Sequence, residues 1–278
     1  MWRVARRYVA GSSLDEAVRT VRALNERGIM ATLDVLGEEV SDPGRAEAFT
    51  EEYLRVYERI DAEGLDCNVS VKPTMLGLFI DEALCRSLLE RLAADAQRRG
   101  NFLRIDMEDR RATDPTLAIY RDLHVRYGPV GTVLQAYMRR TLRDIAELPS
   151  EDANIRLCKG IYIEPRPVAW KGHDTVRRNF VHALDALLDR GVYTAIATHD
   201  EYLLCEAVAS IRRRGLRRDQ YELQMLLGVE EELRDVLVDA GHRLRVYVPY
   251  GEDWYPYSVR RLRENPQIAG HVMRAMWR

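Results

Sequence analysis

The sharpest candidate for chemistry is a pair of adjacent arginines near the C-terminus. Tyr257, Arg260, Arg261 and Glu264 fall at i, i+3, i+4 and i+7, which places them on one face of a helix. Two neighbouring guanidinium groups can hold one carboxylate from two directions, each with paired N–H donors. The same spacing also fits an exposed helix end joined by ion pairs, and spacing alone gives the two interpretations about equal weight.

Further polar residues collect where short apolar runs end, and basic residues outnumber acidic ones among them. Pairing for structural reasons alone would require fewer buried charges. We therefore expect a positive region suited to a phosphorylated cofactor and a carboxylate substrate. The set comprises Lys72, Asp106, Met107, Glu108, Asp109, Gln135, Arg139, Arg140, Arg156, Lys159, Thr198, His199, Glu222, Gln224 and Tyr247.

The sequence predicts no metal site. His199 stands beside Asp200 but has no second histidine at ligand spacing, so we interpret it as a hydrogen-bonding histidine. The four cysteines form no CxxC pair. Cys67 and Cys158 sit in apolar runs, where a buried thiol packs as a small hydrophobic group.

Eight short apolar runs alternate with long amphipathic stretches such as 46–61 and 82–96. Such nearly continuous apolar runs are typical of parallel strands buried on both faces. Ser13 is placed to cap the first helix, and a glycine precedes four of the runs, where a helix C-cap belongs: Gly28, Gly100, Gly191 and Gly241. The runs are 29–36, 67–71, 102–106, 132–136, 154–158, 193–197, 221–225 and 244–248.

Eight such repeats without a break in composition predict an α/β fold, a closed (β/α)₈ TIM-like barrel. We expect one domain over residues 1–278, with the last helix placed over the C-terminal mouth. A doubly wound open sheet is the alternative. In a barrel the functional residues lie at the C-terminal ends of the strands, where the polar residues above fall.

Charge and hydropathy exclude several classes of partner. The formal net charge of -2 creates no overall field that favours nucleic acid or an anionic membrane. No apolar run approaches the roughly 20 residues that a membrane span needs, and no signal peptide is visible. We therefore expect a cytoplasmic protein with reduced thiols and at most peripheral membrane contact.

Seven motifs together resemble the proline dehydrogenase family, in particular its small, monofunctional bacterial enzymes. Each motif is weak alone, but all seven occur in order at strand ends or on the last helix, over nearly the whole chain. The family usually has a helical arm before the barrel, and we expect it to be naturally absent or trimmed from this sequence. The motifs are 69–72, 104–109, 133–137, 156–160, 197–200, 245–251 and 257–264.

The resemblance implies oxidation of L-proline to Δ1-pyrroline-5-carboxylate with reduction of FAD, which a membrane quinone later reoxidises. No aldehyde dehydrogenase domain accompanies the barrel, so the product is expected to pass to a separate pyrroline-5-carboxylate dehydrogenase. By the same resemblance, Arg260 and Arg261 hold the substrate carboxylate and Lys72 faces the substrate. Tyr247 and Tyr257 wall the ring pocket.

The resemblance also assigns catalytic and cofactor positions. Asp106 matches an active-site acid, which we expect to pair with Lys72 or the arginines. Arg156 is expected beside the flavin N5, where a fixed cation raises the electron affinity of the flavin. The FAD-contacting positions are Met107, Gln135, Lys159, Gly160, Ile161, Thr198 and His199, with Arg140 as a further candidate for the phosphates.

Two alternatives remain open. Lys72 or Lys159 at a strand end could act as the nucleophile of a Schiff-base lyase or aldolase on the same barrel, if neighbouring cations lowered its pKa. A non-catalytic barrel that binds a small anion would also use the charged strand ends.

Overall fold

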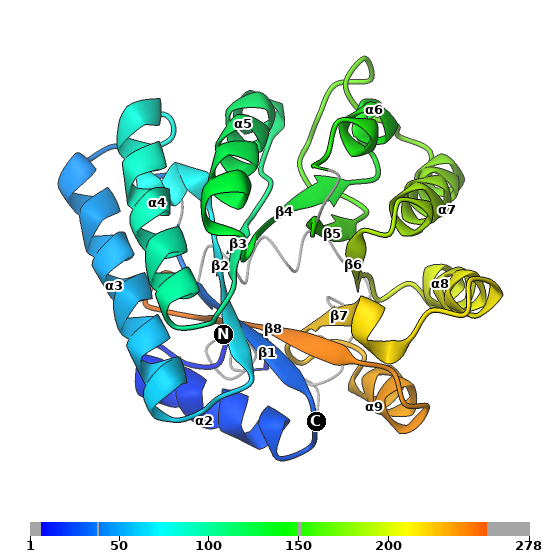
Figure 1. Cartoon of the computed structure of the whole chain (residues 1–278), viewed down its shortest axis with the longest axis horizontal. Helices are drawn as coiled ribbons and strands as arrows, with labels where there is room; N and C mark the ends of the chain where they lie inside the picture. The colour runs from blue at the N-terminus through cyan, green and yellow to red at the C-terminus, as the bar shows by residue number, and fades with distance from the viewer. Residues whose placement is uncertain (1–6, 38, 150–151, 255–278) are drawn as a thin grey trace, which may run out of the picture.

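A computed structural model describes residues 7–37, 39–149 and 152–254. Eight parallel strands close into a barrel in sequence order (Figure 1). The strands are β1 (Met30–Val35), β2 (Cys67–Val71), β3 (Leu103–Ile105), β4 (Val130–Gln135), β5 (Asn154–Cys158), β6 (Tyr193–Ala197), β7 (Tyr221–Leu226) and β8 (Leu244–Tyr250).

The strand predictions are confirmed, each within two residues at either end, and the open sheet is excluded. Closure depends on the contact between the first and last strands. β1 pairs with β8 over its whole length, from Met30 opposite Arg245 to Val35 opposite Tyr250. An open, doubly wound sheet would have two edge strands, whereas each of these eight strands is paired on both sides.

Helices surround the barrel, as Figure 1 shows. α2 precedes β1 and packs on both β1 and β8, so it occupies the place in the ring beside the last strand. The helix expected over the mouth, at 257–264, lies outside the described residues. The helices are α2 (Leu14–Asn25), α3 (Pro43–Ala62), α4 (Glu82–Arg98), α5 (Arg110–Tyr127), α6 (Thr141–Ala146), α7 (His173–Asp189), α8 (Glu201–Arg213) and α9 (Glu231–Asp239), with 3₁₀ turns η1 (Pro73–Leu76) and η2 (Arg218–Gln220).

Local signals fix where the helices begin and end. The Ser13 side chain accepts a hydrogen bond from the Glu16 backbone N–H and caps α2, as predicted. The glycines expected between helix and strand all take left-handed backbone conformations, with φ between 63° at Gly100 and 86° at Gly241. These turns send each helix back toward the amino end of the next strand.

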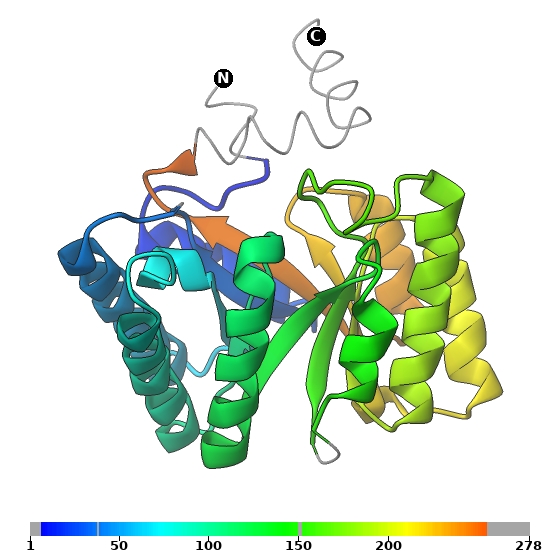
Figure 2. The ribbon, with the colours of Figure 1, turned by 90° about the horizontal axis from the view of Figure 1, so that it is seen from above.

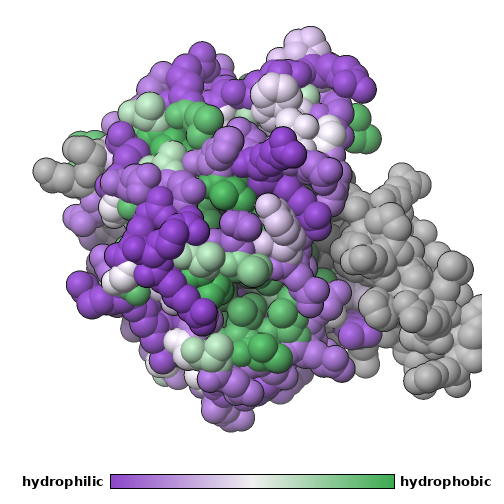
Figure 3. All heavy atoms as spheres, turned by 90° about the vertical axis from the view of Figure 1, so that its right-hand side faces the viewer, coloured by the Kyte–Doolittle hydropathy of each residue, from purple (hydrophilic) through white to green (hydrophobic). Residues whose placement is uncertain are grey.

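The surface carries polar side chains with scattered apolar ones. Figure 3 shows the face that carries α7, α8 and α9 as mainly hydrophilic, with smaller hydrophobic patches between. Tyr202 on α8 and Val236 on α9 are among the exposed large apolar side chains. Among the described helices, none has the length and apolar character needed to span a bilayer.

Candidate active site

The strands run in one direction, so their carboxyl ends meet on one side of the barrel (Figure 2). Two neighbouring ion pairs lie there. In the first, Lys72 at the end of β2 places its Nζ 2.7 Å and 2.8 Å from the two carboxylate oxygens of Asp34 on β1. Asp34 is fully buried, and the Tyr53 hydroxyl donates to it at 3.4 Å. The lysine is therefore held in one position by a carboxylate on the adjacent strand.

This pairing keeps Lys72 protonated. Burial alone lowers the pKa of a lysine, but the carboxylates of Asp34 and Asp106 outweigh burial and raise the pKa of Lys72 above its usual value. A lysine nucleophile needs the opposite shift, because only the neutral amine attacks a carbonyl group.

The second ion pair joins Asp106, directly after β3, to Arg156 on β5. Arg156 Nη1 lies 2.6 Å from Asp106 Oδ1. The Ser70 hydroxyl donates to the same oxygen at 2.8 Å, and the Tyr247 hydroxyl donates to Oδ2 at 3.1 Å. The guanidinium carbon lies 5.2 Å from the centre of the Tyr247 ring. Asp106 thus binds groups from three other strands, β2, β5 and β8.

The expected partner of Asp106 needs a correction. The sequence offered Lys72 or the arginine pair, whereas the described ion pair is made with Arg156. Lys72 instead pairs with Asp34, because β1 lies next to β2 in the closed barrel and carries an inward carboxylate. Asp34 was missed by the sequence analysis, although an acid inside the apolar run 29–36 was a visible signal.

The residues expected to hold the cofactor lie at the ends of β3 to β6. Gln135 donates from Nε2 to the Glu108 carbonyl at 2.8 Å. His199 accepts at Nε2 from the Leu226 backbone N–H at 2.9 Å, so it has the hydrogen-bonding role that we expected. The Thr198 hydroxyl accepts from the Asp200 backbone N–H at 3.1 Å.

The remaining cofactor candidates differ in how much of each side chain is accessible. Met107 is buried at the end of β3, and Ile161 is 41% exposed in the loop after β5. Arg140 is bound by two carboxylates, Asp114 at 2.7 Å and Asp144 at 2.8 Å. These two acids reduce its capacity to bind a phosphate, because both would compete for the same guanidinium.

Lys159 belongs to a three-residue cluster that the sequence did not reveal. Its Nζ lies 3.2 Å from Asp200, which also accepts two hydrogen bonds from Arg177 on α7, at 2.8 Å and 2.9 Å. Two cations share one carboxylate, so the cluster keeps one net positive charge. Arg177 lies in the first turns of a helix, where the sequence gave no sign that it faces the site.

Gly160 has a conformational requirement. Its φ is +105°, a region that residues with a Cβ rarely adopt. A Cβ added there would lie 2.1 Å from the Tyr137 ring. Glycine therefore allows the loop after β5 to pack against the end of β4.

The predicted excess of positive charge is smaller in the described part of the mouth. Lys72, Arg156 and Lys159 each face a carboxylate. Any larger excess depends on the arginine pair Arg260 and Arg261. These two residues and Tyr257 lie outside the described residues.

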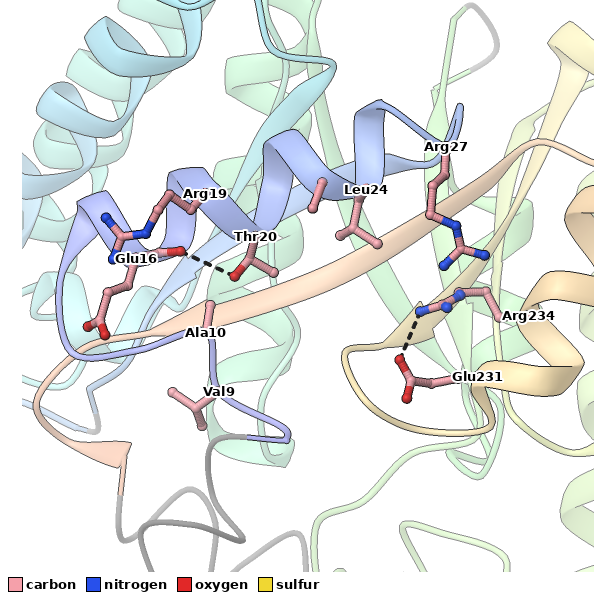
Figure 4. Close-up of a pocket in the computed structure, with 10 residues that line it drawn as sticks. Val9, Ala10, Glu16, Arg19, Thr20, Leu24, Arg27, Glu231 and Arg234 are labelled. Carbon is pink, nitrogen blue, oxygen red and sulfur yellow. Dashed lines mark hydrogen bonds and ion pairs between the residues drawn. The ribbon is translucent and has the colours of Figure 1, made fainter.

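Two hollows differ in their relation to this site. One of about 130 Å³ lies at the mouth and is lined by Lys72, Glu108 and Tyr162, among others. The other, of about 550 Å³, lies between α2 and α9 and shares no residue with the mouth site. Figure 4 shows Arg27, in the turn after α2, on one side of this outer groove and Arg234 of α9, paired with Glu231, on the other.

The described residues fit a flavin nucleotide at this mouth. Arg156 has Nε and Nη1 engaged, while Nη2 makes no hydrogen bond to any described residue. A cation with one free donor suits a ring that gains negative charge. The Lys159–Arg177 cluster, with its net positive charge, suits a phosphate group. Fold and site together define an enzyme of the (β/α)₈ barrel class, with a mouth of paired charges and one cationic cluster that fit a cofactor.

Comparison with known proteins places the chain within that class. A profile of the proline dehydrogenase family matches residues 17–274. Proline dehydrogenase of Deinococcus radiodurans is 38% identical over 99% of this chain and 91% of its own length. Proline dehydrogenase 2 of Bacillus subtilis is 37% identical over 98% of this chain and 90% of its own length. The chain belongs to the proline dehydrogenase family and is therefore a flavin-dependent oxidoreductase.

A structural neighbour supports the fold. Proline utilization A from Bdellovibrio bacteriovorus, in a crystal structure of the protein inactivated by N-propargylglycine, superposes with a TM-score of 0.88. The match covers 94% of this chain and 32% of that larger protein, at 22% sequence identity. At this identity the likeness supports the barrel and nothing finer.

Proposed function

We propose that this chain oxidises L-proline to Δ1-pyrroline-5-carboxylate, with FAD as the bound flavin, as one catalytic barrel over residues 1–278. The observation that carries the proposal is the Asp106–Arg156–Tyr247 cluster beside the Asp34–Lys72 pair, in a chain of this family. When bound, FAD supplies the acceptor for the hydride that leaves ring C5 of proline.

Arg156 acts at the reacting edge of the flavin. Its fixed charge stabilises the negative charge that accumulates near N5, and Asp106 holds it in place through a 2.6 Å ion pair. Because the partners come from separate strands, the guanidinium is oriented before the substrate arrives. The hydride leaves C5 while the ring nitrogen is, or becomes, neutral, and we assign no described residue as the base that takes the proton from this nitrogen.

Substrate binding divides between residues at the described mouth and three residues near the C-terminus that lie outside the described residues. Lys72, held protonated by Asp34, faces the carboxylate side, and Tyr247 forms one wall of the ring pocket. Arg260 and Arg261 clamp the carboxylate, and Tyr257 is the second residue that walls the ring pocket. These last three assignments come from the family resemblance alone.

The cofactor is held by residues from β3 to β6. Lys159 and Arg177 face the phosphates, with Arg140 as a weaker candidate because two carboxylates already bind it. The other contacts proposed are Met107, Gln135, Gly160, Ile161, Thr198 and His199.

The proposal extends to the acceptor and the product. A membrane quinone reoxidises the flavin, and the product passes to a separate pyrroline-5-carboxylate dehydrogenase. The enzyme works in the cytoplasm, with at most peripheral contact to the membrane.

The Schiff-base alternative is disfavoured by the state of Lys72. Its pKa is raised and its Nζ is bound by both carboxylate oxygens of Asp34, so the neutral amine that such chemistry needs is scarce. Nothing in the described residues favours a purely anion-binding barrel over the enzyme.

One anaerobic experiment tests the proposal. L-proline is added to the FAD-loaded protein, and the visible absorbance of the flavin is followed. We expect bleaching with L-proline and none with D-proline. A flavin that stays oxidised contradicts the proposal, and borohydride trapping of a carbonyl substrate on a lysine would favour the lyase instead.

A further inference from the structure

Gln224 on β7 links Arg156 to Glu222 by hydrogen bonds inside the barrel. Its amide oxygen accepts a hydrogen bond from Arg156 Nε at 2.6 Å, and its amide nitrogen donates to a carboxylate oxygen of Glu222. A donor on one side and an acceptor on the other allow only one orientation of the amide. Gln224 is itself 5% exposed, so water does not substitute for either contact.

Glu222 is in turn fixed by a second ion pair. Arg245 on β8 binds both of its oxygens through Nε, at 3.0 Å and 3.1 Å, and the Tyr193 hydroxyl donates to it at 3.0 Å. Burial raises the pKa of a carboxyl, but the Arg245 guanidinium outweighs burial and lowers the pKa of Glu222 to about 2. Arg245 also donates to the Ala31 carbonyl at 2.6 Å. The chain of contacts is thereby anchored to the backbone of β1.

The geometry follows from strand alternation. Glu222 and Gln224 are two residues apart on β7, so both point to the same face of the strand, into the barrel. Gln224 lies opposite Arg245 in the register between β7 and β8. The contacts therefore run from the β8 side of the interior across β7 to Arg156 on β5.

Arg156 is thus held on both sides. Asp106 and Ser70 bind Nη1, while Gln224 binds Nε, and these contacts fix the plane of the guanidinium. The ion pair with Asp106 alone would still allow the group to rotate about that contact. The contact at Nε removes this freedom and leaves Nη2 as the donor without a described partner.

We propose that Gln224, oriented by the Glu222–Arg245 ion pair, is a positioning residue that aims Arg156 at the reacting edge of the flavin. This inference rests on the proposed function. Gln224 touches neither the substrate nor the reacting atoms in this assignment. Its effect is on the electron affinity of the flavin and the rate of hydride transfer, and the affinity for proline is left unchanged.

The test uses the full-length, FAD-loaded protein with Gln224→Met, which keeps the volume and removes both contacts. We expect a more negative midpoint potential of the bound flavin. We also expect kcat to fall about tenfold or more, as for loss of one hydrogen bond to a charged group. KM for proline should stay within about twofold. Gln224→Asn, which keeps an amide but is one methylene too short to reach both partners, should shift both values in the same direction.

Asn68→Leu is the matched control. Asn68 is a buried amide on β2 that binds Thr32 and does not contact Arg156. This variant should lose stability but keep the potential of the flavin. The inference is overturned if both Gln224 variants keep the wild-type potential and kcat, or if Asn68→Leu shifts the potential as far. Wild-type protein that proline does not reduce would instead contradict the proposed function, while the potentials would still test the role of Gln224.

Discussion

Asp34 binds Lys72 with both carboxylate oxygens, at 2.7 Å and 2.8 Å, from the neighbouring strand of a closed barrel. The pair is buried: Asp34 helps to raise the pKa of Lys72, whereas burial outweighs the effect of Lys72 and raises the pKa of Asp34. The pair places the protonated amine of Lys72 at the mouth, but the positive and negative charges of the two partners cancel. The charge that attracts a substrate carboxylate must therefore come largely from other residues, and the candidates are Arg260 and Arg261, which lie outside the described residues.

The first prediction concerns this pair. Asp34→Asn removes the main group that raises the pKa of Lys72, so that pKa should fall, because Asp106 alone opposes burial less than the two carboxylates do together. In the wild type the pKa of Lys72 is raised above 10.5. The contribution of protonated Lys72 to folding stability is therefore full at neutral pH and is lost only as pH rises through the raised pKa. In the variant, the alkaline limb of the pH profile of kcat/KM should move to lower pH.

Asp219→Asn, which breaks the exposed Arg217 pair instead, provides the control and should leave the profile unchanged. An alkaline limb that stays in place in Asp34→Asn would show that Lys72 does not depend on Asp34 for its charge.

The second prediction concerns the carboxylate clamp. Arg261→Met removes a charge-assisted hydrogen bond worth roughly 1.5–3 kcal/mol, so KM for proline should rise about 10- to 100-fold. Steady-state kinetics measures this rise, with Lys171→Met, an exposed lysine in the loop after β5, as the control. An unchanged KM would remove Arg261 from the proposed clamp.

The third prediction concerns the Glu222–Arg245 ion pair and stability. Glu222→Gln leaves Arg245 buried without its anion, and such a change costs about 3–5 kcal/mol of unfolding free energy. Urea unfolding at neutral pH measures this loss. A loss below about 1 kcal/mol would show that the Arg245 charge is satisfied elsewhere.

The same ion pair predicts how the unfolding free energy of the protein changes at acidic pH. The pKa of Glu222 is lowered from 4.5 to about 2, so its contribution to stability is full above 4.5 and is lost as pH falls toward 2. Wild-type protein should therefore lose more unfolding free energy between pH 5 and pH 3 than Glu222→Gln does, within the roughly two-unit window set by the shift.

The fourth prediction concerns Gly160. Gly160→Ala places a Cβ 2.1 Å from the Tyr137 ring at a φ of +105°, so the loop after β5 must move. The protein should then retain less FAD after purification, measured as the ratio of flavin to protein absorbance. Gly44→Ala, near the start of α3 with only ordinary contacts, should retain the wild-type amount. Full retention in Gly160→Ala would show that the loop does not hold the cofactor.

The sequence by itself determined the barrel and the strand ends at which its chemistry lies. Hydrophobic periodicity and helix caps are local signals, so eight strands and residues such as Asp106 and Arg156 could be placed without coordinates. Residues 255–278 lie outside the described residues, so the roles of Tyr257, Arg260 and Arg261 stay predictions from the sequence.

Only the tertiary structure decided which charges pair. Asp34 meets Lys72, Asp106 meets Arg156, and Arg140 is bound by Asp114 and Asp144. The pairings made by Asp34, Asp106 and Asp114 join distant segments and depend on which strands and helices lie side by side in the barrel. Arg140 and Asp144 are instead a local i, i+4 pair at the start of α6. The direction of an inward side chain follows from alternation along one strand, but its partner follows from which strand lies next to it.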